Sequence, residues 1–291
     1  MARAFQPRIS EARISRIGTT NLRPPISRFA SSKFSSIIAV MYRNRSVYST
    51  RSALKVYANM PDITPAEQFI FAEEQARIAA GPVLDIGVGA GRTTACLATV
   101  AGQYYGVDYS PAMIVYCRRR FPGLEFILAD AADMPMLTSG SFPFILFSFN
   151  GIDSVDHAHR LRILGEVRRL LAPDGRFAFS AHNRAYRDIQ LKPRFRRPLR
   201  LRGVARTGVE IANHLRVRCR SYECDEYALI NDPPHLFSIV TYYIGRRAQI
   251  DQLEAQGFRV LKVIDAEGRV VSDRDDETVS PNFYYLTEAR V

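Results

Sequence analysis

Residues 83–93 place a carboxylate and several glycines in one short run, VLDIGVGAGRT. Glycine tolerates positive φ and lets the backbone lie against a ligand with no side chain between them. A carboxylate directly before the first glycine suits a cationic ligand better than a pyrophosphate. The run therefore predicts a ligand-binding loop, and its candidate residues are Asp85, Gly87, Gly89 and Gly91.

The glycine spacing argues against a dinucleotide site. Such a site expects G-x-G-x-x-G. Here the third glycine, Gly91, comes one residue early, and Arg92 stands where the last glycine of the fingerprint should be. We therefore expect a different cofactor, bound where open α/β sheets bind ligands, at the carboxyl ends of the strands near the switch in strand order.

Helices and strands alternate from about residue 62. Periodicity and end signals, such as Thr64 followed by Pro65 at a helix start, predict these elements. The predicted helices span 64–80, 92–100, 111–120, 159–171 and 246–256, and the predicted strands span 83–86, 104–107, 125–128, 144–149, 176–180, 238–244, 258–264 and 283–289. This alternation predicts an α/β fold with a mostly parallel, doubly wound sheet and helices on both faces.

The chain divides into four segments. Residues 1–57 form a basic, Ser/Arg-rich extension that we expect to be disordered, and residues 62–183 form the core. Residues 184–240 interrupt the alternation, and we expect them to form a small cap with β content over 215–230. Residues 241–291 return to the core. Three interpretations of the extension stay open: a disordered tail, an organelle transit peptide, or a start of translation at Met41 or Met60.

The net charge of +11 is concentrated in two segments. Residues 1–57 hold 11 basic residues and one acid, and residues 184–220 hold 12 basic residues and two acids, so each contributes +10. The remainder carries 11 − 20 = −9. Because the basic charge does not cover the whole protein, we do not expect nucleic acid as a partner.

Cysteine spacing and hydropathy indicate in which cell compartment the protein works. None of the four cysteines forms a CxxC pair, so we expect free thiols in a reducing cytosol and no metal site. No run of about 18 apolar residues occurs, so we expect no membrane partner and a cytoplasmic location.

Several motifs together resemble one family, the class I S-adenosylmethionine-dependent methyltransferases, over residues 65–183 and more weakly over 240–289. Residues 85–91 are similar to its first motif and residues 106–110 to its second, in which Asp108 would bind both ribose hydroxyls. The resemblance implies a Rossmann-like fold with an antiparallel last strand and S-adenosylmethionine as the cofactor. It also implies that Tyr109 and Met113 border the cofactor.

The later motifs follow in the family's order. Residues 129–131 are similar to the third motif, in which Asp130 would take the adenine amino group and the backbone of Ala131 would reach the ring. Phe149 and Asn150 follow the fourth strand, beside the methyl group to be transferred. Residues 170–176 are similar to the family's turn before the fifth strand.

The segments 150–153 and 180–183 look like those of methyltransferases that act on small molecules. Methyl transfer needs alignment and water exclusion more than covalent help. We predict Asn150 and His182 as catalytic residues, and Asn183, Tyr242 and Tyr243 as substrate residues. Ordinary loop contacts and strand packing are the alternatives for all but Asn150.

The acceptor stays open. The arginines of the cap could receive an anionic small molecule, or they could form a solvated basic face. An RNA or protein methyltransferase that docks through its basic segments is the first alternative function, and a non-catalytic S-adenosylmethionine-binding scaffold is the second. The sequence indicates no oligomeric state.

Overall fold

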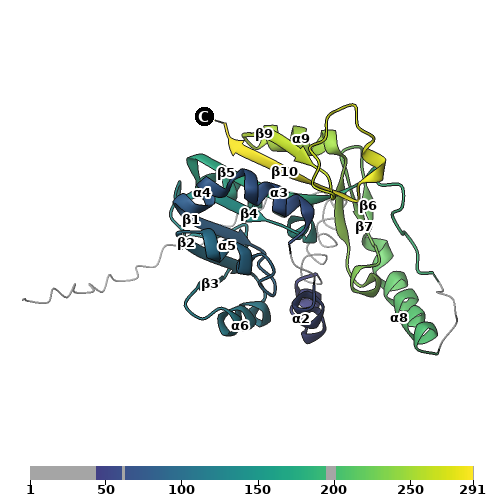
Figure 1. The fold of residues 1–291 in the computed structure, drawn as a ribbon. Helices are drawn as coiled ribbons and strands as arrows, with labels where there is room; N and C mark the ends of the chain where they lie inside the picture. The colour runs from purple at the N-terminus through teal and green to yellow at the C-terminus, as the bar shows by residue number, and fades with distance from the viewer. Residues whose placement is uncertain (1–43, 61–62, 195–200, 291) are drawn as a thin grey trace, which may run out of the picture.

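The structure is a computed structural model that describes residues 44–60, 63–194 and 201–290, except for the side chains of 201 and 202 (Figure 1). The prediction for residues 1–43 lies outside the described residues.

A single mixed sheet forms the centre of the molecule. Its strands are β1 (Pro82–Ile86), β2 (Gln103–Asp108), β3 (Glu125–Leu128), β4 (Phe142–Phe147), β5 (Leu171–Asn183), β6 (Tyr222–Glu223), β7 (Tyr227–Ile230), β8 (Thr241–Ile244), β9 (Phe258–Ile264) and β10 (Asn282–Ala289). The order is β3-β2-β1-β4-β5-β8-β7-β6, and β10 pairs antiparallel with both β5 and β9. The pairs from β3 to β5 are parallel. The predicted doubly wound sheet with an antiparallel last strand is confirmed.

The strand order reverses at β1, whose neighbours are β2 on one side and β4 on the other. Because these strands are parallel, their carboxyl ends meet at one edge of the sheet. The residues that end β1, β2 and β4 are Ile86, Asp108 and Phe147. This edge therefore carries the motifs that the sequence singles out.

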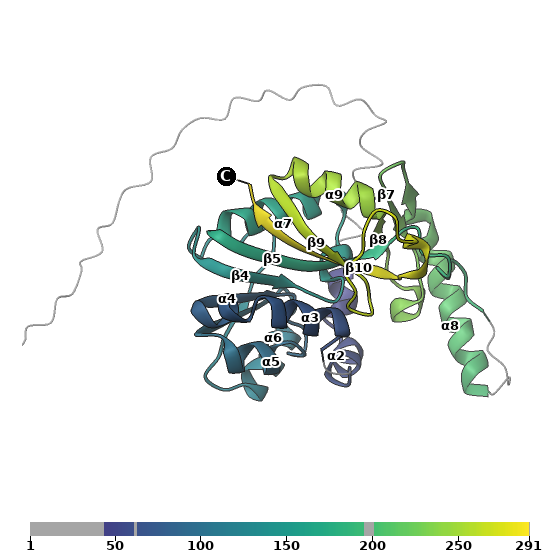
Figure 2. The ribbon, with the colours of Figure 1, turned by 45° about the horizontal axis from the view of Figure 1, so that its top comes forward.

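Helices cover both faces of the sheet. They are α2 (Arg51–Ala58), α3 (Pro65–Glu73), α4 (Gln75–Ala80), α5 (Thr94–Val100), α6 (Pro111–Arg120), α7 (His157–Leu170), α8 (Leu201–Val217) and α9 (Arg246–Ala255), with short 3-10 turns η1 (Gly151–Ser154), η2 (Arg218–Arg220), η3 (Pro234–Phe237) and η4 (Glu277–Val279). Figure 2 shows α3 to α6 on one face and α7 and α9 on the other. Strand side chains alternate between two cores accordingly: Phe144 and Leu146 pack on one side, and Ile145 and Phe147 on the other.

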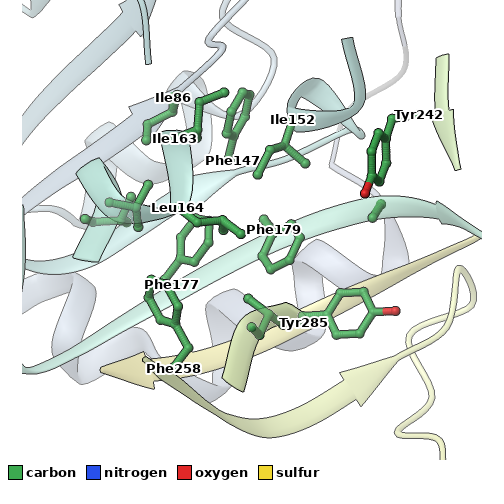
Figure 3. Packing of buried hydrophobic residues seen from close by; sticks show 14 of the residues in the cluster. Ile86, Phe147, Ile152, Ile163, Leu164, Phe177, Phe179, Tyr242, Phe258 and Tyr285 are labelled. Carbon is green, nitrogen blue, oxygen red and sulfur yellow. The ribbon is translucent and has the colours of Figure 1, made fainter. Parts of the chain in front are cut away.

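The core under α7 is rich in aromatic rings (Figure 3). Phe177 and Phe179 point to the same face of β5 because they are two residues apart, and their rings stack with centroids 4.9 Å apart. Tyr285 from β10 continues the stack at 5.3 Å from Phe179. This packing fixes β5, whose end enters the site.

The chain enters the core through a capped helix. Thr64 and Glu67 form a capping box at the start of α3, as the Thr64-Pro65 signal predicts. The predicted helix over 64–80 is divided at Glu74 into α3 and α4. Glu67 is therefore fixed at the first turn, where it also binds Arg92 of the glycine loop.

Residues 44–57 correct the prediction of disorder over residues 1–57. Residues 44–48 are helical, and α2 follows. Asn44 is 2% exposed, and its Nδ2 donates to the carbonyls of Ser154 and Val240, both at 2.8 Å. Long-range hydrogen bonds hold this segment, which is why local composition did not predict its order.

Residues 184–240 correct the prediction of β content over 215–230. The helix α8, which the sequence did not predict, extends through Val217, and only β6 and β7 are strands. These strands extend the main sheet, because β7 pairs with β8 and β8 pairs with the end of β5. The segment is therefore an extension of the sheet edge with a peripheral helix.

We expect Asn44→Ala to lower the free energy of unfolding by about 1–3 kcal/mol, because two buried carbonyls lose their donor. Chemical denaturation measures the change. Asn59→Ala is the matched control, since Asn59 is exposed and its side chain bonds only to the nearby carbonyl of Lys55. Equal stability of the two variants would contradict the anchoring role of Asn44.

Candidate cofactor and acceptor site

A pocket opens at the carboxyl edge of the sheet. The glycine loop, the residues after β2 and the residues after β4 form its floor, and Tyr48, Tyr57 and Met60 form an opposite wall. Among the predicted cofactor residues, Asp85, Gly87, Gly89, Asp108, Tyr109, Met113, Ala131 and Phe149 line it, as does the predicted catalytic residue Asn150.

Asp85 is buried at the end of β1. Its Oδ2 accepts hydrogen bonds from the Thr93 hydroxyl at 2.6 Å and from the Tyr104 hydroxyl at 2.8 Å. Burial raises the pKa of Asp85 to about 6, although both hydroxyls lower it in part. The site therefore contains a carboxylate whose charge changes close to neutral pH and which favours a cation beside it.

Asp108 ends β2 and is held by the backbone. Its Oδ2 accepts from the Gly89 N–H at 2.9 Å, and its Oδ1 accepts from the Ser110 N–H at 2.8 Å. Each carboxylate oxygen has a second lone pair, so the group can still accept two hydroxyl hydrogen bonds. Burial raises its pKa.

Gly87 and Gly91 lack a side chain for different structural reasons. Gly87 has φ +65°, and a Cβ there would lie 2.6 Å from the ring of Phe147. Gly91 does not line the pocket; a Cβ on it would lie 2.4 Å from the ring of Phe121. The prediction that Gly91 contacts the cofactor is thus not supported, because its bare backbone makes room for Phe121.

Asp130 lines an adjoining cavity, together with Ala131 and Tyr109, which border both cavities. Its Oδ1 lies 2.7 Å from Nε2 of His159 and accepts from the backbone N–H of Ala132 at 3.0 Å. Burial would raise the pKa of Asp130, but the hydrogen bond from His159 and that of Ala132 lower it overall. Asp130 therefore stays ionised and fixed in place.

A buried ion pair joins the glycine loop to α3. Arg92 binds Glu67 in a bidentate manner, at 2.6 and 2.5 Å, and Glu67 also accepts from the hydroxyls of Ser148 and Tyr284. Burial alone would raise the pKa of Glu67, but Arg92, the Ser148 hydroxyl and the Thr64 backbone N–H together outweigh it and keep that pKa below its usual value. In the sequence, Arg92 was notable only because it stands where a dinucleotide fingerprint has its last glycine. No sequence signal paired it with Glu67.

The backbone after β4 adopts an unusual conformation. Phe149 and Asn150 have φ of 53° and 56°, the left-handed region that costs most residues conformational energy. The backbone N–H of Asn150 donates to the Ser180 hydroxyl at 2.7 Å. The Phe149 ring is 45% exposed and lies under Arg92, whose guanidinium carbon is 4.9 Å from the ring centroid.

The two segments 150–153 and 180–183 meet in space. Nδ1 of His182 donates to Oδ2 of Asp153 at 2.8 Å, and the His182 backbone N–H donates to the same oxygen at 2.6 Å. Nε2 of His182 then faces Nδ2 of Asn150 at 3.2 Å. Asp153 is fully buried and paired with the buried Arg160. His182 does not line the pocket, so Asn150 stands between it and the pocket.

The three predicted substrate residues lie elsewhere, which corrects those predictions. Asn183 is 1% exposed and donates to the carbonyls of Glu277 and Ser280. Tyr242 is fully buried in the aromatic core, and its hydroxyl lies 2.8 Å from Nδ1 of His157.

Tyr243 packs its ring 4.9 Å from that of His182 and donates its hydroxyl to Asp232 at 2.8 Å. On strand β8, adjacent residues point to opposite faces, so the pair Tyr242-Tyr243 could not line one pocket.

The sequence predicts that residues 184–240 form a cap over the pocket. Residues 44–60 cover it instead. None of the residues 184–194 or 201–240 lines this pocket. The η3 turn supports the wall from behind, because the ring of His235 lies 4.8 Å from that of Tyr48 and its Nε2 lies 3.4 Å from the Tyr57 hydroxyl. The sequence missed this wall because it carries no recognisable motif.

The site fits S-adenosylmethionine. Asp108 offers a backbone-held carboxylate suited to two hydroxyls, and Gly87 leaves a cradle that a side chain would fill. Asp85 supplies negative charge for a cationic ligand. The cavity at Asp130 adjoins the pocket and extends the available space.

Known proteins match the same region. Residues 83–175 match the family described as "Methyltransferase domain". The chain is 35% identical over 104 residues to the demethylmenaquinone methyltransferase of Clavibacter sepedonicus, which covers 35% of this chain and 41% of that protein. It is 35% identical over 96 residues to the phthiotriol/phenolphthiotriol dimycocerosates methyltransferase of Mycobacterium leprae (strain TN). This match covers 32% of this chain and 34% of that protein. The chain thus matches less than half the length of these relatives.

Solved structures share the fold. An S-adenosylmethionine-dependent methyltransferase from Clostridium acetobutylicum ATCC 824 aligns with a TM-score of 0.55 at 14% identity, covering 90% of this chain and all of that one. At this identity, the likeness supports the Rossmann-like fold alone.

We expect Asp108→Asn to weaken S-adenosylmethionine binding by about 1–3 kcal/mol, because the amide cannot replace a carboxylate that accepts from both backbone and ligand. Calorimetric titration measures the affinity. Asp174→Ala, an exposed aspartate remote from the pocket, is the control. The assignment of Asp108 would be wrong if both variants bound the ligand like the parent chain.

We expect the affinity for S-adenosylmethionine to fall as the pH drops from about 7 to about 5. Protonation of Asp85, whose pKa burial raises to about 6, removes negative charge beside a cationic ligand. Asp85→Asn should flatten this dependence and leave only the contribution of Asp108. An unchanged pH profile in Asp85→Asn would rule Asp85 out as the titrating group.

Proposed function

We propose that this chain, which carries a class I S-adenosylmethionine-dependent methyltransferase domain, catalyses methyl transfer to a small-molecule acceptor. The observation that carries the proposal is the pocket in which Asp85, Asp108 and the glycine loop face Asn150 and the tyrosine wall. Two relatives that match this domain are named for methylating demethylmenaquinone and phthiotriol dimycocerosates, which supports a small-molecule acceptor.

The cofactor would lie along the carboxyl edge. Asp108 would hold the ribose hydroxyls, Asp130 and Ala131 would hold the adenine, and the loop from Gly87 to Gly89 would contact the methionine part. When bound, S-adenosylmethionine supplies a methyl group on a positively charged sulfur. The chain's own part is to bind, to orient and to exclude water.

The acceptor would enter between the tyrosine wall and the residues after β4. Tyr48, Tyr57, Met60 and Phe149 give this side of the pocket an aromatic and apolar character. Arg92 is the basic residue among the described lining residues, and Glu67 neutralises it. We therefore favour an uncharged acceptor with an apolar or aromatic body over an anionic one.

Asn150 would contact the acceptor, and His182 would position Asn150. Because Asp153 accepts from Nδ1 of His182, the proton stays on that nitrogen and Nε2 accepts from the Asn150 amide. The amide orientation is then fixed, and its Oδ1, which is buried without a hydrogen-bond partner, would gain one from a donor on a bound acceptor. This favours an acceptor whose reacting atom carries a proton.

The alternatives gain less support. An RNA or protein methyltransferase docked through its basic segments would require their basic side chains in the pocket. None of the described residues of 184–240 lines it, and the N-terminal segment contributes Tyr48 and Tyr57 to it rather than a basic side chain. A non-catalytic scaffold does not account for the hydrogen-bonded Asp153–His182–Asn150 chain. A cytoplasmic location agrees with four free cysteines and remains part of this proposal.

Turnover tests the proposal. The full chain should convert S-adenosylmethionine to S-adenosylhomocysteine when given quinol or phenol acceptors, measured by mass spectrometry. Cofactor binding without turnover on any neutral acceptor, combined with turnover on RNA or protein, would overturn it.

We expect Asn150→Asp to lower kcat by about ten- to hundred-fold with little change in cofactor affinity, because a carboxylate cannot donate to Nε2 of His182. Aspartate keeps the shape and tolerates the left-handed backbone. Steady-state kinetics and calorimetry separate the two effects. Unchanged kcat would remove Asn150 from the reaction.

A further inference from the structure

The helix α8 turns polar residues toward the protein and apolar residues toward the solvent, the reverse of an ordinary surface helix. Surface helices normally turn their apolar stripe toward the core. In α8 the residues that face the body include Thr207 and Glu210, which are 4% and 5% exposed. Figures 1 and 2 show the helix at the periphery, extending beyond the sheet.

Apolar side chains form the outer face of α8. Val204 is 42% exposed, Ile211 is 38% exposed and Leu215 is 56% exposed. With the exposed Gly208 they recur at the spacing i, i+4, i+7 and i+11, which places them on one continuous stripe. Val209, at 48% exposure, lies on another side of the helix and is not part of this stripe.

Specific contacts on the polar face hold the helix in this orientation. Nδ2 of Asn213 donates to the carbonyl of Leu236 at 3.0 Å, and Nδ1 of His214 lies 2.8 Å from Oδ1 of Asn231. The stripe therefore points away from the protein because the opposite face is anchored to η3 and to the end of β7.

Basic side chains are exposed at the C-terminal end of α8 and in the segment before it. Arg216 and Arg218 are exposed, whereas Arg206 projects from the side of the helix opposite the stripe and pairs with Glu210 at 3.0 Å. Lys192 and Arg194, before the helix, are exposed as well. Residues 184–220, the segment that includes α8, contain 12 basic residues and two acids in the sequence, a net charge of +10.

We propose that α8 docks the protein on an anionic lipid bilayer, lying in the plane of the interface with its apolar stripe among the acyl chains. An apolar face accompanied by arginines is the pattern of interfacial helices, and each basic residue near an anionic surface adds attraction. None of the helices in the described part of the chain is long and apolar enough to cross a membrane. The proposal concerns peripheral binding and goes beyond the proposed methyl transfer.

A bilayer explains both features of the surface at once. Nucleic acid would pair with the arginines but would leave Val204, Ile211 and Leu215 in water. A second copy of the chain would cover the apolar stripe but would bring two strongly positive segments together. An anionic bilayer buries the stripe and neutralises the arginines.

The docking surface is joined to the pocket wall. His214 of α8 packs its ring 5.6 Å from that of Phe237 in η3, and His235 of the same turn packs against Tyr48. Figure 1 shows α2 and α8 on the same side of the molecule. Docking through α8 would therefore place the tyrosine wall near the lipid surface.

Vesicle flotation with the full chain tests the proposal. We expect binding to phosphatidylcholine vesicles that contain about 30% phosphatidylglycerol, and several-fold weaker binding to pure phosphatidylcholine or in about 0.5 M salt. The double variant Ile211→Ser/Leu215→Ser should lose about tenfold or more in vesicle affinity, because two apolar side chains no longer enter the bilayer. Arg216→Gln/Arg218→Gln should lose affinity and salt dependence together.

Val115→Ser/Leu261→Ser is the matched control, since both residues are exposed, at 48% and 36%, and lie on other elements. This control should bind vesicles like the parent chain. Calorimetric titration with S-adenosylmethionine should be unchanged in every variant, which shows folding and separates this proposal from the proposed methyl transfer.

Three results would overturn the proposal. The first is no binding to anionic vesicles by the parent chain. The second is equal vesicle binding by Ile211→Ser/Leu215→Ser and the control. The third is a parent dimer, detected by light scattering, that Ile211→Ser/Leu215→Ser dissociates while vesicle binding stays absent, which would assign α8 to contact between two copies.

Discussion

Buried carboxylates at the carboxyl edge of the sheet are the constraint on which the site depends. Glu67 and Asp153 are fully buried, and each is tolerated only because an arginine and further donors satisfy it. Arg92 ties the glycine loop to α3, and Arg160 ties α7 to η1 and, through glutamines, to α9. Loss of either partner would leave an uncompensated charge in the interior, so these pairs fix the elements that carry the pocket.

At the same edge, residues from separate sequence segments come together in one hydrogen-bonded group. Asn150 follows β4, and His182 lies at the end of β5; parallel pairing of these strands brings both to one place. The left-handed backbone at Phe149 and Asn150 turns the Asn150 amide toward His182. Asp153 accepts the proton on Nδ1 of His182 in a hydrogen bond and so orients the imidazole ring. Strain in the loop and burial of the carboxylate thus serve the same geometry.

The two basic segments end in different roles. Residues 44–57 of the N-terminal extension pack over the pocket and contribute aromatic rings to it. The internal segment instead forms a peripheral helix whose apolar face points outward. Both were indistinguishable by charge, since each contributes +10. What separates them is their long-range partners: Asn44 reaches the carbonyls of Ser154 and Val240, whereas α8 is held by hydrogen bonds from its polar face and by the buried Val217 at its end.

The sequence by itself determined the mostly parallel, doubly wound sheet with its antiparallel last strand, and it singled out Asp85, Gly87, Asp108 and Ala131, which line the pocket. These follow from local patterns, because apolar periodicity and glycine spacing are read within about ten residues. Only the tertiary structure decided what depends on distant contacts. It placed Gly91, Asn183 and Tyr242 in packing roles, set Tyr48 and Tyr57 over the pocket, and joined Asp153 to His182. It also showed α8 where β structure was predicted, because hydrogen bonds from its polar face to η3 and β7 outweigh the β-like composition of residues 215–217.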